Sequence, residues 1–147
     1  MIVVAMDLPK PTNQRSMDTH NATIKQAWPY QQSVLDLPVN DLDAALPFYL
    51  NTMGFRLVSQ TDTPHRSARL ARDEVEIGLA ENGRDPTQDG CVFEVDSVAN
   101  ALAELIDNGW QERPEFRSQQ HGTTSWSVFF VVAPDGLCYC YGQRQGE

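Results

Sequence analysis

The sequence predicts an α+β protein made of two βαβββ units that form one curved mixed sheet, with a concave cleft on one face and helices on the convex face. Two stretches of the chain predict this fold, because they repeat the order of a strand, a polar helix cap, a helix, a glycine and an aromatic residue. Each stretch then continues in three short runs of high β propensity. With 147 residues, 41% of them hydrophobic, the chain is long enough for one compact domain with a core.

The first unit is expected at about residues 30–82, with its first strand at 34–39. Asp41 or Asp43 can cap the helix that follows, and Pro47 fits the first turn of this helix only if the helix begins at Asp43. The apolar residues of the helix fall on one face, at Leu42, Ala45, Leu46, Tyr49 and Met53. The remaining strands are predicted at 55–60, 67–72 and 75–80.

The second unit, at about residues 88–143, repeats this order. Its first strand is predicted at 91–95, and Ser97 can cap the next helix by accepting a backbone N–H bond. The apolar face of that helix is Val98, Ala101, Leu102, Leu105 and Ile106. Three more strands are predicted at 111–116, 127–132 and 137–142.

Residues 1–29 are rich in Pro, Asn, Gln, Thr and Ser and have no sustained hydrophobic period. We therefore predict a flexible N-terminal tail at 1–29 and one folded domain at 30–147. The apolar run at the N-terminus is too short for a secretory signal or a membrane span, and the three cysteines are an odd number. The expectation is a cytoplasmic protein with free thiols.

The formal net charge of −9 argues against a nucleic-acid partner, because such proteins carry a basic stripe. No membrane partner is expected either. The same charge favours cationic small molecules through the long-range field of the protein. The charge is explained equally well if the acidic residues serve only to keep the protein soluble.

Several motifs together resemble the glyoxalase I/bleomycin-resistance/extradiol-dioxygenase superfamily, also called vicinal oxygen chelate proteins. Residues 37–49 and the Met-Gly-Phe at 53–55 are similar to the opening unit of this family, and residues 93–98 and 134–136 to its second unit. The resemblance covers about residues 32–143. It implies the same paired-unit fold, and a homodimer in which both subunits line each cleft.

In metal-dependent members, four positions on the concave face hold the ion, usually as two His and two Glu. The resemblance places these positions on Val34, Gly78, Gly90 and Cys140. Valine and glycine have no donor atoms in their side chains, and one cysteine cannot hold a divalent ion alone. No His lies within two residues of any of the four. We therefore expect neither a metal nor another cofactor, and a chain that resembles the metal-free, bleomycin-resistance-like members most.

Strand alternation then predicts which other residues line the cleft beside these positions. If Val34, Gly78 and Gly90 face the cleft, the alternate residues do so as well, while the apolar residues between them pack beneath the helices. Cys138 would face the same side as Cys140, and Trp126 with Phe129 or Phe130 could stack on a ligand. The predicted ligand-binding residues are Val34, Asp36, Glu76, Gly78, Gly90, Val92, Glu94, Trp126, Cys138 and Cys140.

These residues predict a protein that binds a small cationic or planar molecule in an acidic cleft, without a metal and without catalysis. The alternative is a lyase, isomerase or dioxygenase of the superfamily. Such an enzyme would have relocated metal ligands or a metal-free acid/base mechanism on Asp36 or Glu94. A third possibility is an interaction subunit without a ligand, whose cleft would be filled by its own side chains or by the N-terminal tail.

Overall fold

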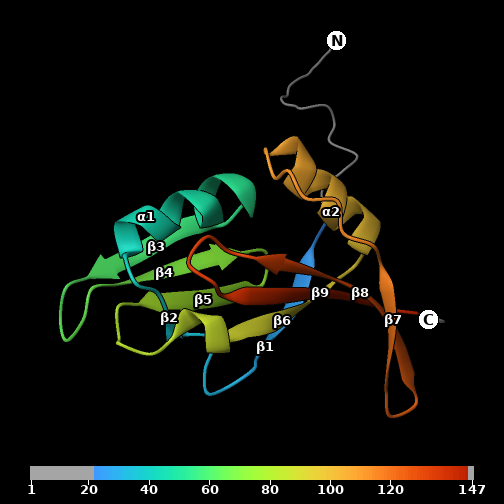
Figure 1. Ribbon diagram of the computed structural model, residues 1–147, viewed down its shortest axis with the longest axis horizontal. Coiled ribbons are helices and arrows are strands. Elements are labelled where there is room, and N and C mark those ends of the chain that lie inside the picture. The colour runs from blue at the N-terminus through green and yellow to red at the C-terminus, as the bar shows by residue number, and fades with distance from the viewer. Residues whose placement is uncertain (1–21, 146–147) are drawn as a thin grey trace, which may run out of the picture.

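The computed structural model describes residues 22–145 and has an α+β fold with two sheets (Figure 1). The elements of the first unit are β2 (Leu37–Pro38), α1 (Leu42–Pro47), β3 (Arg56–Thr61), β4 (Ser67–Arg72) and β5 (Val75–Ala80). Those of the second are β6 (Gly90–Val95), α2 (Val98–Asp107), β7 (Arg117–His121), β8 (Thr124–Val132) and β9 (Cys138–Arg144). A further strand, β1 (Ile24–Pro29), precedes both units, and a 3-10 helix (Pro86–Gln88) lies between them.

Both units have the same topology. In each, the first strand pairs in parallel with the last one, β2 with β5 and β6 with β9, and the other two strands follow in antiparallel order. The helices α1 and α2 lie on the same side of the two sheets (Figure 1). The predicted fold class is thus confirmed. The single curved sheet of the prediction consists of two hydrogen-bonded sheets, ordered β2-β5-β4-β3 and β1-β6-β9-β8-β7.

The predicted tail is wrong in its last residues, because Ile24–Pro29 form β1 and pair antiparallel with β6. Ile24 is fully buried, and Trp28 lies opposite Val92. This pairing covers a strand edge of β6 that would otherwise leave N–H and C=O groups without partners. The folded domain therefore begins before residue 30. The rest of the predicted tail, residues 1–21, lies outside the described residues.

The predicted strand at 34–39 is wrong in its first half. Residues 33–36 form a turn in which the N–H of Asp36 donates to the carbonyl of Ser33 (3.3 Å) and that of Leu35 to the Ser33 hydroxyl (3.0 Å). A serine hydroxyl that binds its own backbone competes with strand pairing. As a result Val34 packs against the core and Leu35 is exposed, the reverse of the predicted alternation.

Helix α1 accommodates Pro47 by a change of helix type, which the sequence did not predict. Asp41 caps it and accepts the N–H of Ala44 (3.3 Å), so Pro47 lies in the interior rather than in the first turn. Because proline has no N–H, Pro47 cannot donate the backbone hydrogen bond that an α-helix has at this position. The chain continues as a π-helix (Phe48–Thr52), in which the N–H of Met53 donates to the carbonyl of Phe48 (3.0 Å).

Most other strands lie within a few residues of their predicted positions. The exception is 111–116, where no strand forms and β7 begins at Arg117 instead. Pro114 lies in that stretch and cannot donate to a ladder. Within residues 22–145, no helix is long and apolar enough to cross a membrane.

A largely buried arginine joins the two units to the segment that precedes β1. Arg72, at the end of β4, donates to the carbonyls of Met53 and Ala22 (both 2.6 Å). It also donates to the carboxylate of Glu104 on α2 (2.8 Å). The side chains of Arg72 and Glu104 are 12% and 16% exposed, so little solvent screens this pair.

We predict that Arg72→Met lowers the free energy of unfolding by about 3 kcal/mol, because it leaves the Glu104 carboxylate and two backbone carbonyls without their partner. Urea unfolding measures the effect. The matched control is Arg69→Met on the same strand, whose exposed pair with Glu76 (3.3 Å) contributes less than about 1 kcal/mol. Equal effects of the two substitutions would contradict the role given to Arg72.

Candidate functional site

The five-stranded sheet carries an apolar groove of about 500 Å³ on the face opposite the core. Along β8 and β9, groove residues alternate with buried core residues, as strand geometry requires. The groove is lined by Trp28, Tyr30, Val92, Gln119, His121, Trp126, Val128, Phe130, Cys140 and Gly142.

Four of the residues that line the groove have aromatic side chains. Trp28 of β1 and Trp126 of β8 stand edge to face, with ring centroids 6.2 Å apart and planes at 89°. A Cβ on Gly142 would lie 3.2 Å from the Trp126 ring, so the glycine lets the indole lie close over β9. Trp28, Tyr30 and Phe130 keep between 37% and 42% of their surface exposed. Rings fixed by packing but open on one face are suited to stacking on a ligand.

The polar groups of the groove carry no negative charge at neutral pH. Burial, and secondarily the neighbouring Cys138, raises the pKa of the Cys140 thiol to about 11, so this thiol stays protonated. Burial likewise raises the pKa of the Tyr30 hydroxyl, with a further contribution from Cys138. The ring of His121 is held by the side chain of Gln119, Nε2 to Oε1 3.1 Å. The ten described lining residues include no Asp or Glu.

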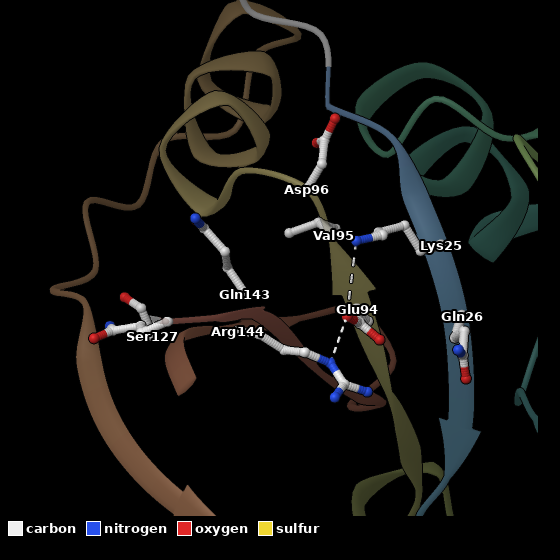
Figure 2. A pocket seen from close by; sticks show the side chains of 9 residues that line it. Lys25, Gln26, Glu94, Val95, Asp96, Ser127, Gln143 and Arg144 are labelled. Atoms are coloured by element: carbon white, nitrogen blue, oxygen red, sulfur yellow. Dashed lines mark hydrogen bonds and ion pairs between the residues drawn. The ribbon is translucent and has the colours of Figure 1, made fainter. Parts of the chain in front are cut away.

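The three carboxylates predicted to face the cleft lie outside this groove, and each is paired with an arginine. Asp36 pairs with Arg84 (3.5 Å) and Glu76 with the exposed Arg69 (3.3 Å). Glu94 is 4% exposed and accepts from Arg144 (2.9 Å), with Lys25 at 4.0 Å. It borders a separate polar pocket of about 820 Å³ at the end of β6 and β9 (Figure 2). The expected acidic lining is therefore not a property of the aromatic groove.

The other predicted residues divide between the groove and the core. Val92, Trp126 and Cys140 line the groove, and Cys138 hydrogen-bonds the Tyr30 hydroxyl beside it. Gly90 is the strand neighbour of Cys138. Val34 packs against the core instead of the cleft, and Gly78 lies beneath the backbone of Leu35. Of the two candidate stacking rings, Phe129 is fully buried and Phe130 lines the groove.

Two of the four positions that the family resemblance assigns to metal ligands cannot hold a ligand side chain. A Cβ added at Gly78 would overlap the carbonyl oxygen of Leu35, and one at Gly90 would overlap that of Cys138. These two positions therefore exclude any side chain, whatever its donor atoms. Within residues 22–145, no group of three or more His, Cys, Asp or Glu converges where an ion could be held.

Sequence reasoning missed half of the aromatic lining, because Trp28 falls in the predicted tail and Tyr30 lies at the predicted start of the domain, before its first strand. A signal for them was present. Two aromatic residues two positions apart point to the same face of a strand, and such a pair is unusual at the end of a polar tail. Gln119, His121 and Val128 carried no signal of their own.

The chain matches the model of a known protein family. The model of the Glyoxalase/Bleomycin resistance protein/Dioxygenase superfamily matches residues 31–136. The chain belongs to this superfamily. The match spans more than half of the chain and includes the first unit and all of the second unit except β9. No curated protein matches the chain.

Solved structures show the same superfamily fold at low sequence identity. TnmS3, an antibiotic binding protein from Streptomyces sp. CB03234, is 20% identical with a TM-score of 0.56, over 78% of this chain and 97% of its own. A superfamily member from Alicyclobacillus acidocaldarius is 14% identical with a TM-score of 0.60, over 76% and 89%. A virulence protein from Salmonella typhimurium is 20% identical with a TM-score of 0.57, over 77% and 95%.

We predict that Gly78→Ala destabilises the protein by about 3 kcal/mol, because the new methyl group overlaps the backbone of the turn at Leu35. Gly83→Ala is the control: its Cβ would meet open space, and its positive φ of +85° costs about 1 kcal/mol. Urea unfolding of both variants measures the difference. If Gly78→Ala were as mild as the control, the closed backbone contact would be refuted.

Proposed function

We propose that this chain binds a planar small molecule in its aromatic groove, and that it does so without a metal ion. The observation that carries the proposal is the pair of partly exposed tryptophans, Trp28 and Trp126, set edge to face in the groove. With Tyr30 and Phe130 they offer aromatic surface from two distant parts of the chain. Stacking of this kind contributes about 0.5–1.5 kcal/mol per ring pair beyond the area that it buries.

The size and polarity of the groove fit a ligand of drug size. Its volume of about 500 Å³ lies within the range of ~300–1,000 Å³ typical of small-molecule sites. Because no carboxylate is among the described lining residues, flatness rather than positive charge selects the ligand. A planar cation also fits, since the faces of tryptophan rings attract positive charge.

The comparison with TnmS3 supports an antibiotic or a similar natural product as the ligand class. That protein is described as antibiotic binding, and this chain has the same fold over most of the length of both. Holding such a compound stoichiometrically would remove it from solution. The proposed role is therefore sequestration, with protection of the cell as its consequence.

The proposal includes a cytoplasmic homodimer. The cysteines among residues 22–145 are all free thiols, which suits a reducing compartment. Strand β3 forms an edge of its sheet and exposes Leu57 (43%) and Val58 (52%). An exposed apolar edge strand is a surface on which a second copy of the chain can pair.

No observation favours the alternative of an acid/base enzyme. Its two candidate groups, Asp36 and Glu94, both pair with arginines, and neither lines the aromatic groove. The third possibility, an interaction subunit with a filled cleft, does not fit a groove that is open beside four aromatic rings.

Isothermal titration calorimetry with 9-aminoacridine, a planar probe, tests the proposal. We expect saturable binding that is unchanged by EDTA, and a loss of about tenfold in affinity for Trp28→Ala, because the exposed indole supplies stacking area. Leu35→Ala, a similarly exposed apolar truncation in the turn at residues 33–36, should leave the affinity unchanged. Binding that EDTA abolishes, or that Trp28→Ala leaves intact, would refute the proposal.

A further inference from the structure

We propose that Arg144 determines which planar ligands the groove accepts, by donating hydrogen bonds to an acceptor at one end of the ligand. The acceptor is a carbonyl, a phenolate or a carboxylate attached to the ring system. This inference rests on the proposed binding function and adds the chemical class of the ligand.

Arg144 lies where the aromatic groove meets the polar pocket. It is the cross-strand neighbour of Trp126, and its guanidinium carbon lies 5.0 Å from the centroid of that ring. Trp126 lines the groove, while Arg144 lines the polar pocket (Figure 2). A ligand stacked beside Trp126 therefore has one end close to the guanidinium.

The guanidinium is held in place before any ligand arrives. Its Nε donates to Oε2 of Glu94 at 2.9 Å, and the Glu94 side chain is only 5% exposed. A buried carboxylate needs its cationic partner, so this ion pair fixes Arg144 at one end. The guanidinium also lies over the ring of Trp126, a cation–π contact that limits its movement. An arginine positioned in this way loses little further freedom when it binds a ligand.

The remaining donors of Arg144 are available. The side chain is 40% exposed, and within residues 22–145 neither terminal nitrogen has a hydrogen-bond partner. Figure 2 shows these nitrogens on the side of the guanidinium away from Glu94. Their N–H groups form a planar fork, which matches carbonyl and carboxylate oxygens.

Two other polar side chains of the pocket are already engaged with the backbone. Asp96 accepts the backbone N–H of Thr23 (2.9 Å), and Gln143 accepts that of Val98 (2.9 Å). The charged residues of the pocket balance, with Lys25 and Arg144 against Glu94 and Asp96. The pocket thus has no surplus of negative charge that would attract a cationic end group, whereas Arg144 offers free donors to an acceptor.

Two planar probes distinguish the outcomes: anthraquinone-2-carboxylate, which carries acceptors, and 9-aminoacridine, which is a cation. Calorimetry with the full chain should show that Arg144→Gln weakens binding of the anthraquinone about tenfold or more, since a hydrogen bond to a charged group is lost. The affinity for 9-aminoacridine should stay the same or rise. Arg69→Gln, which removes a similarly exposed arginine elsewhere, should change neither.

Because Arg144→Gln leaves Glu94 with only Lys25, the double variant Glu94→Gln/Arg144→Gln removes both charges of the ion pair together and should discriminate between the probes in the same way. Equal weakening of both probes, or no effect on the anthraquinone, overturns the role of Arg144. A wild-type chain that binds only 9-aminoacridine overturns it too, and leaves the proposed binding function standing. If neither probe binds, both proposals fail.

Discussion

The structure depends on two close backbone contacts that leave no room for a side chain. At Gly78 the turn at Leu35 passes over β5, and at Gly90 the backbone of β9 lies against β6 with the Tyr30 ring 2.9 Å from where a Cβ would be. The first contact holds the turn of residues 33–36 in place, and the second lets Tyr30 approach the sheet. The same contacts leave no room for a side chain at two of the four positions that the family resemblance assigns to metal ligands.

Once these positions are closed, aromatic and guanidinium groups define the open surface. Trp28 and Trp126 face the groove, and Arg144 stacks on Trp126 while Glu94 holds it. The acidic side chains that the net charge of −9 would suggest as ligand groups instead neutralise arginines. Whole-chain charge is therefore a poor guide to the chemistry of this site, because ion pairing across strands determines which charges remain available.

The sequence predicted well what depends on local periodicity. The apolar residues of β5 and β6 that were expected in the core are all buried there: Val75, Ile77, Leu79, Cys91, Phe93 and Val95. It could not predict β1, whose partner β6 is more than 60 residues away and which directly follows a polar segment. Nor could it predict the turn at Ser33, which needs the open space over Gly78, or the pairing of Glu94 with Arg144 across two strands. These features depend on distant partners rather than on neighbours in the chain.

Strand β1 contributes to the groove without being part of the two repeated units. This strand belongs to neither repeated unit, yet it contributes Trp28, and Tyr30 follows directly after it. Its outward side chains can change without disturbing the helices or the buried rings of the second unit. Divergence within such a scaffold can thus proceed by exchange of one short segment. For the engineer, grafting a different strand at residues 24–30 is a route to new ligands on an unaltered framework.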